Sequence, residues 1–343
     1  MATIDTPLGR TGFAPRAGRL ARRIGRALAI FLAAVLALAL SGASYESVAA
    51  LGDAGRFPPP GRLVDVGGHR LHIQCAGAGS PTVVLEAGWG GWSLDWSTVQ
   101  QDIAATTRVC AYDRAGMGWS EAGPLPRTPE RVAGELHTLL ANAGESGPYV
   151  LVGHSLGAKY VRLFATRYPA EVAGMVLVDG RHEHVDFSLT PEERASEDGT
   201  LDMLRRISEI TGRLGIARAF GAPLISALVP DAARMPAETR ALYALLGTRQ
   251  RAIEAKISEV TERSASDDEL RRATLGDLPL VAIMASESRK LGQVWDDAQQ
   301  KQAALSSRGR LVIAQGSGHI VQWDQPAAVI EVVREVAAAA SER

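Results

Sequence analysis

One serine stands at the point where a predicted strand turns into a predicted helix. The stretch YVLVGHSLGAKYVRLFA, residues 149–165, begins with apolar residues typical of a buried strand and continues with apolar residues at helical spacing. Ser155 lies at the junction, and the flanking Gly153 and Gly157 carry no Cβ atom that would collide with the neighbouring strand and helix. The turn therefore predicts a serine hydroxyl held out from the edge of a sheet, where it can act as a nucleophile.

A serine hydroxyl needs a base and a group that orients the base to react near neutral pH. The chain has seven histidines, and His319 is the candidate because QGSGHIVQWDQP places it in a glycine-rich loop between the last predicted strand and the last predicted helix. A loop at the carboxyl end of a strand can reach Ser155, and the order serine, acid, histidine is the one that such triads use on this kind of scaffold. His154 adjoins the serine in sequence, so we expect its side chain to point away from the site.

The rest of the chain must position these groups. With 343 residues, of which 46% are hydrophobic and 22% charged, it can bury a large core that holds one domain and an insertion. Short apolar strands alternate with helical segments, which predicts an α/β fold with a mostly parallel sheet covered by helices on both faces. Residues 181–276 show helix signals without a convincing strand. We therefore expect a core of residues 61–180 and 277–343, interrupted by a helical cap that roofs the serine.

Four motifs together resemble the α/β-hydrolase superfamily, over the chain from about Arg62 to the last helix. They are GHSLG at the serine, LEAGWGGWSLDW after the third predicted strand, YDRAGMGWS after the fourth, and GSGH near the end. The resemblance implies an α/β-hydrolase fold, an eight-stranded sheet with a helical cap between the sixth and seventh strands. It also implies Ser155 as the nucleophile and His319 as the base.

The same resemblance implies an oxyanion hole made of two backbone N–H groups. One belongs to Leu156, directly after the serine, and the other to Trp89 in the loop after the third strand. That loop reads Ala87-Gly88 where the family usually has His-Gly, which need not matter because the donors are backbone groups. Three residues of the next motif are expected to brace the loop beside the site: Asp113, Arg114 and Gly116.

The acid that orients His319 is left between two positions. The family usually carries it after the seventh strand, where this chain has Ser288 at about the expected place and Glu287 beside it. Some members carry it at the end of the sixth strand instead, and GMVLVDG places Asp179 there. We expect Asp179 to be the acid, with Glu287 as the alternative; an Asp179 that only caps nearby backbone N–H groups is the structural alternative.

These residues predict a serine hydrolase that cleaves a carboxylic ester, like an esterase or lipase, through an acyl-serine intermediate and without a metal or organic cofactor. Acyl transfer, or hydrolysis of an amide or thioester, would use the same triad. A non-catalytic, membrane-tethered binding protein is the alternative from another class. The substrate is expected to be a small ester with an apolar group, because four tryptophans gather near the predicted mouth of the site: Trp89, Trp92, Trp96 and Trp119. The alternative is that these side chains fill the core beneath the cap.

The N-terminal segment indicates a membrane, and not a nucleic acid, as a partner. Its first 26 residues carry six Arg and one acid, although the net charge of the chain is −1, and an uncharged run follows over residues 27–45. We expect residues 1–50 to be a signal peptide or membrane anchor and residues 51–60 a linker. Basic residues ahead of the run place the catalytic domain outside the cytoplasm. It would be membrane-anchored, or secreted or periplasmic if the segment is cleaved after Ala43 or Ala50.

The chain has only two cysteines, Cys75 and Cys110, which excludes a disulfide-rich scaffold and a cysteine-based zinc site. Both fall in predicted strands. In an exported domain they can form a disulfide, and two unlinked thiols in the core are the alternative.

Overall fold

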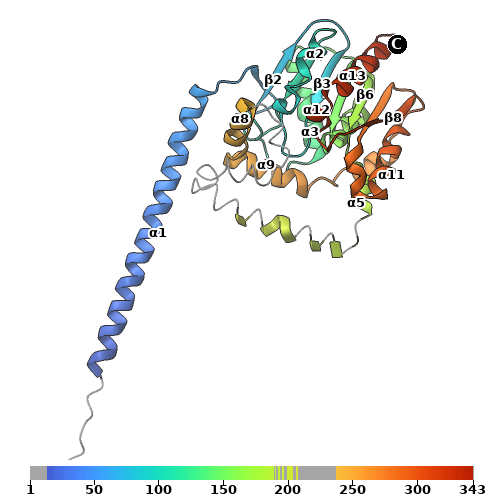
Figure 1. Cartoon of the computed structure of the whole chain (residues 1–343). Coiled ribbons are helices and arrows are strands. Elements are labelled where there is room, and N and C mark those ends of the chain that lie inside the picture. The colour runs from blue at the N-terminus through green and yellow to red at the C-terminus, as the bar shows by residue number, and fades with distance from the viewer. Residues whose placement is uncertain are drawn as a thin grey trace, which may run out of the picture.

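A long helix leads into an α/β domain built on one sheet (Figure 1). The structure is a computed structural model, and it describes residues 14–342 apart from positions 189, 191, 194, 197–198, 204–205 and 208–236. The strand order is β1-β2-β4-β3-β5-β6-β7-β8, and the sheet is parallel except where β2 pairs with β1 and β4. The predicted α/β-hydrolase fold, with eight mostly parallel strands, is confirmed.

The central strands carry buried side chains on both faces, because helices cover the sheet on both sides. Side chains of α3 and α4 pack on one face, and those of α2 and α13 pack on the other. The strands are β1 (Arg62–Asp65), β2 (Arg70–Ala76), β3 (Thr82–Glu86), β4 (Val109–Tyr112), β5 (Tyr149–His154), β6 (Val172–Val178), β7 (Leu280–Ala285) and β8 (Gly309–Ala314).

The helices follow the strands along the chain and include three short 3-10 turns among the described residues. They are α1 (Ala14–Arg56), η1 (Ser93–Trp96), α2 (Gln100–Ala104), α3 (Pro129–Ala143), α4 (Gly157–Arg167), η2 (Pro169–Glu171), α5 (Glu183–Phe187), α8 (Ala237–Gly247), α9 (Gln250–Thr261), α10 (Asp267–Arg272), η4 (Ser286–Leu291), α11 (Gln293–Ala303), α12 (Val321–Asp324) and α13 (Pro326–Ser341).

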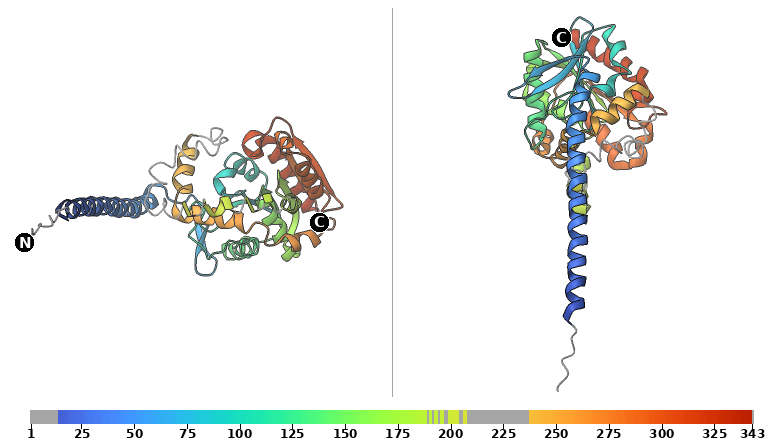
Figure 2. Two further views of the ribbon diagram at one scale, coloured as in Figure 1. Left: turned by 90° about the horizontal axis from the view of Figure 1, so that it is seen from below. Right: turned by 90° about the vertical axis from the view of Figure 1, so that its left-hand side faces the viewer.

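Helix α1 stands away from the α/β domain (Figure 2). Within the described part of the chain, its segment Arg22–Tyr45 is the one stretch long and apolar enough to cross a membrane, and the rest of the chain does not bury it. The helix continues to Arg56, into the range that the sequence suggested as a linker, because residues 46–56 contain no proline. It ends just before Pro58, so the connection to β1 is shorter than predicted.

Among the described residues, the insertion between β6 and β7 contains helices joined by turns and no strand, and these helices include α5, α8, α9 and α10. A capping box lies near its start: the N–H of Thr190 donates to Glu193, and the N–H of Glu193 donates to the Thr190 hydroxyl. The remainder of the predicted cap, chiefly positions 208–236, lies outside the described residues. Helix α9 reaches the loop after β3, where the Trp89 indole N–H donates to the Lys256 carbonyl at 2.7 Å.

Cys75 and Cys110 stand directly opposite each other on the antiparallel strands β2 and β4. Their sulfur atoms are joined in a disulfide. The structure therefore has the paired form of the two alternatives, and this bond ties the edge hairpin to the parallel part of the sheet.

Candidate active site

Ser155 occupies a tight turn between β5 and α4 whose backbone is strained. Its φ is +50°, a left-handed value that residues with a side chain rarely adopt. A Cβ on Gly157 would lie 2.6 Å from the Ala87 carbonyl oxygen, and one on Gly153 would lie 2.7 Å from the Gly157 carbonyl oxygen. Both positions therefore require glycine, as the sequence predicted. The turn presents the serine side chain at the carboxyl edge of the sheet.

Side chains from three distant segments meet at this turn. The Nε2 atom of His319, in the loop after β8, is 2.9 Å from Ser155 Oγ. The Nδ1 atom of the same ring is 2.6 Å from Oδ2 of Asp179, which follows β6. Asp179 is fully buried, whereas 39% of the His319 side chain is exposed. This arrangement can accept the serine proton on one ring nitrogen while the other is held by the carboxylate.

Asp179 is held by donors on both of its oxygens. Oδ1 accepts from the Ala285 N–H and from the Trp295 indole N–H, each at 3.1 Å. Oδ2 accepts from the Ser288 hydroxyl at 2.5 Å, in addition to His319. In the sequence, Ser288 stood out only as the residue at the usual acid position, and no motif pointed to Trp295. These bonds fix the carboxylate and leave it no freedom to turn away from the histidine.

Glu287, the alternative acid, lies apart from this group. It is exposed, and its backbone N–H donates to the Ser317 carbonyl at 3.0 Å. Over the residues that the structure describes, no hydrogen bond or ion pair links the Glu287 side chain to His319. The structure thus brings Asp179, and not Glu287, to the histidine.

His154 packs against His319 instead of pointing away from the site, so that expectation was wrong. Its buried ring is centred 4.9 Å from the His319 ring, and its Nε2 is 3.0 Å from the His319 backbone oxygen. Burial, and then the neighbouring His319, lowers the pKa of His154 to about 3, so the ring is neutral and its Nε2–H donates to that carbonyl. The alternation of β5 could not reveal this contact, because it depends on how the distant loop after β8 folds back over the strand end.

The two expected oxyanion donors, the N–H groups of Leu156 and Trp89, belong to segments that lie against the serine. Leu156 follows Ser155 directly, and a Cβ built on Gly88, the residue before Trp89, would lie 3.1 Å from the Ser155 Cβ. Among the described residues, no backbone or side-chain acceptor takes a hydrogen bond from either N–H. Two such donors beside a serine can bind a negatively charged oxygen.

Ionisable groups are also buried behind the loop of residues 87–91. Burial raises the pKa of Glu86 to about 7 and that of Asp95 to about 7. Burial likewise lowers the pKa of Lys256, on cap helix α9, to about 8. The loop that carries Trp89 therefore rests on buried ionisable groups from β3, from η1 and from the cap.

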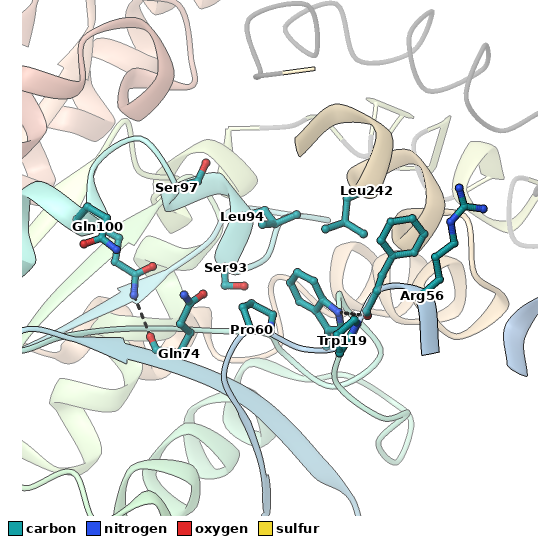
Figure 3. A pocket seen from close by; sticks show the side chains of 12 residues that line it. Arg56, Pro60, Gln74, Ser93, Leu94, Ser97, Gln100, Trp119 and Leu242 are labelled. Carbon is teal, nitrogen blue, oxygen red and sulfur yellow. Dashed lines mark hydrogen bonds between the residues drawn. The ribbon is translucent and has the colours of Figure 1, made fainter. Parts of the chain in front are cut away.

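The four tryptophans do not form one cluster at the site. Trp92 and Trp96 are completely buried, whereas 53% of Trp89 is exposed beside the serine. Trp119 lines a separate cavity of about 490 Å³ between the end of α1, η1 and α8 (Figure 3), and no triad side chain takes part in its wall. The core-filling alternative therefore holds for two of these residues, and the argument for an apolar substrate rests on Trp89.

Comparison with known sequences agrees with this geometry. Residues 71–332 match a family model described as "Alpha/beta hydrolase family". An uncharacterized protein of Schizosaccharomyces pombe is 30% identical over 304 residues, which cover 78% of this chain and 54% of that protein. The chain spans about half the length of this relative and of a second curated relative that it matches.

Solved structures show the same fold at low sequence identity. A thermophilic esterase from Thermogutta terrifontis has a TM-score of 0.58 at 21% identity, covering 80% of this chain and 96% of that one. The enol-lactonase from Burkholderia xenovorans has a TM-score of 0.60 at 17% identity, covering 80% of this chain and 99% of that one. At such identities the likeness extends to the fold alone.

Proposed function

The chain belongs to the alpha/beta hydrolase family, and from this premise we propose that it is a serine hydrolase that cleaves a carboxylic ester. One observation carries the proposal: Ser155, His319 and Asp179 are linked by hydrogen bonds of 2.9 and 2.6 Å at the carboxyl edge of the sheet. The triad order along the chain, serine, acid and histidine, is the one that this scaffold uses. A serine at the turn also argues against the epoxide and carbon–halogen reactions that need an aspartate nucleophile.

In the proposed reaction Ser155 Oγ attacks the ester carbonyl carbon while its proton passes to Nε2 of His319. The carbonyl oxygen becomes an oxyanion and receives hydrogen bonds from the N–H groups of Leu156 and Trp89. When the C–O bond to the alcohol breaks, the proton on His319 goes to the leaving oxygen. Water then repeats the sequence on the acyl-serine, releases the carboxylic acid and restores the serine. Asp179 orients the imidazole and stabilises its charged form throughout.

The same triad would also serve acyl transfer, in which an alcohol takes the place of water, and hydrolysis of an amide or thioester. Ester hydrolysis is favoured because a site with an exposed base and one exposed indole, Trp89, admits water readily. A purely binding role is less well supported, since such proteins usually lack one of the catalytic side chains.

We further propose that α1 anchors the catalytic domain outside the cytoplasm. The apolar segment Arg22–Tyr45 follows a basic N-terminal stretch, which favours retention of that end in the cytoplasm. The disulfide between Cys75 and Cys110 is consistent with an exported domain, because cytosolic thiols are kept reduced. Protease protection of the α/β domain in sealed, right-side-out vesicles or cells would contradict this topology.

Hydrolysis of p-nitrophenyl esters, from acetate to dodecanoate, by the full chain in detergent tests the activity. Turnover that disappears in Ser155→Ala, together with fluorophosphonate labelling of the wild type but not of that variant, is the expected result. The acyl chain length that is hydrolysed fastest then indicates the size of the site that binds the acyl group. Folded wild-type protein that neither hydrolyses any of these esters nor reacts with the fluorophosphonate would refute the proposal.

A further inference from the structure

Arg114, in the loop after β4, lies beneath the loop that carries Trp89. It is 2% exposed, and its guanidinium donates to the carbonyl oxygens of Ala87 and Gly88 at 2.8 and 2.7 Å. Its other hydrogen bonds go to two buried carboxylates: Glu86 of β3 at 2.5 Å and Glu259 of cap helix α9 at 2.7 and 3.0 Å. The five N–H groups of an arginine are thus all used, so this side chain has one orientation.

The contact with Gly88 has a consequence for the next residue. The carbonyl of Gly88 and the N–H of Trp89 belong to one peptide plane, and in a trans peptide they point in opposite directions. The Arg114 guanidinium at 2.7 Å and the Gly91 N–H at 3.1 Å both donate to this carbonyl and hold it in place, so the Trp89 N–H is turned away from Arg114. Gly88 abuts the Ser155 Cβ, and no acceptor among the described residues takes that N–H. The N–H is therefore available beside the serine because its peptide is held from behind.

We propose that Arg114 is a positioning residue that sets the oxyanion hole, and that Glu259 holds it there from the cap. The inference rests on the proposed function and adds a physical link between the cap and the chemistry. Glu259 is completely buried and lies 145 residues from Arg114 in the chain, so the link exists only when α9 is packed on the domain. A displaced α9 would remove two of the five bonds to Arg114 and loosen the Gly88–Trp89 peptide.

A lysine cannot replace this arginine. Its single ammonium group would keep the positive charge between Glu86 and Glu259 but could not bond to two carboxylates and two carbonyls at once. Arg114→Lys therefore separates the positioning role from simple charge neutralisation. Arg127 offers a matched control, because it is 1% exposed and paired with buried Glu135, and its guanidinium contacts the Pro124 carbonyl, not the loop of residues 87–91.

The test compares Arg114→Lys, Glu259→Gln and Arg127→Lys with the wild type, all as full chains in detergent. Active sites are counted by fluorophosphonate titration, and kcat, KM and inhibition by a trifluoromethyl ketone, which forms an oxyanion on Ser155, are measured per active site. We expect Arg114→Lys to lower kcat about tenfold or more, to weaken ketone binding in proportion, and to leave KM within about threefold. Glu259→Gln should act in the same direction but less strongly, and Arg127→Lys should keep kcat per active site near the wild-type value.

Equal losses in Arg114→Lys and Arg127→Lys, or an unchanged kcat per active site in folded Arg114→Lys, would overturn the inference. If Arg114→Lys does not fold, the same comparison of Glu259→Gln with Arg127→Lys decides it. If the wild type shows neither turnover nor labelling, the proposed function fails, and a crystal structure of Arg114→Lys then decides the positioning role. A Gly88 carbonyl rotated from its wild-type direction supports that role, and an unchanged peptide overturns it.

Discussion

Replacing Asp179 by asparagine should do more than remove a charge, because the surrounding donors dictate how the amide must sit. Oδ1 accepts from two fixed donors, the Ala285 N–H and the Trp295 indole N–H. An NH2 group there would face two other donors, so the amide oxygen must take that position. The NH2 group is then forced toward His319 Nδ1, where the wild type has a carboxylate oxygen. The Ser288 hydroxyl can rotate to accept from it and does not oppose this orientation.

An amide that donates to Nδ1 requires that nitrogen to be unprotonated. The neutral imidazole then carries its proton on Nε2, which is 2.9 Å from Ser155 Oγ and can no longer accept the serine proton. The corresponding change in a serine protease triad lowers kcat by about 10⁴-fold, or roughly 5 kcal/mol of transition-state stabilisation. We expect Asp179→Asn to lose kcat on this scale with little change in KM, because the carboxylate does not reach the substrate.

The assay is steady-state hydrolysis of the best p-nitrophenyl ester, normalised to folded protein, with Glu287→Gln as the matched control. Because Glu287 is exposed, removing its charge in Glu287→Gln should leave kcat unchanged. If the kcat of Asp179→Asn stays within about tenfold of the wild-type value, the explanation by the imidazole tautomer is refuted. A large loss of kcat in Glu287→Gln, with a small loss in Asp179→Asn, would instead identify Glu287, after the seventh strand, as the acid.

Three further outcomes follow from contacts around the site and in the sheet. His154→Phe removes the donor to the His319 carbonyl and should lower kcat about tenfold with a slower fluorophosphonate reaction; an unchanged labelling rate would mean that the loop needs no such support. Replacing Cys75 and Cys110 by alanine removes a cross-link between residues with a sequence separation of 35. By the chain-entropy estimate this lowers the free energy of unfolding, measured in urea titrations, by about 4 kcal/mol. If dithiothreitol does not cause the same loss in the wild type, the disulfide is not the source of this stability. Burial raises the pKa of Asp95 from 3.8 to about 7, so between these pH values the folded state holds a proton that the unfolded chain releases, and the fold loses stability as the pH rises. The stability of Asp95→Asn relative to the wild type should therefore be greater at pH 8 than at pH 4. Equal differences in the free energy of unfolding at both pH values would show that Asp95 does not titrate in this range.

The sequence indicated Ser155 and His319 from local turn chemistry, and the structure brings their side chains within hydrogen-bond distance of each other. Gly153 and Gly157 are needed wherever a strand turns into a helix this tightly, and they mark Ser155 without knowledge of the rest of the fold. The acid stayed open for a topological reason: β6 and β7 are neighbours in the sheet, so a carboxylate at the end of either strand can reach one histidine. Only the packed structure shows that the end of β7 contributes a hydroxyl, Ser288, to a carboxylate from β6.

The contacts that the cap and His154 make could not be predicted from the sequence. The cap helix α9 shows helical spacing in the sequence, and Arg114 was expected to brace the loop beside the site, but no pattern ties Glu259 to Arg114 until the cap folds onto the sheet. The same holds for His154, whose partner is a backbone carbonyl in the loop after β8. Local patterns therefore mark the reacting groups, while the groups that hold them in place emerge from tertiary packing.

Backbone strain at the site is shared by Ser155 and Asp179. Ser155 and Asp179 are the two described non-glycine residues with positive φ, at +50° and +40°, and they follow adjacent strands. Such values cost free energy, which neighbouring backbone bonds must offset. The Ser155 N–H donates to the Val178 carbonyl, and the Ser155 carbonyl accepts from the Arg181 N–H at 2.8 Å, so the segment flanking Asp179 holds the serine on both sides. We therefore expect a change that moves the end of β6 to displace Ser155 together with Asp179. The position of His319, in its separate loop, is then the variable that sets the geometry among the three side chains.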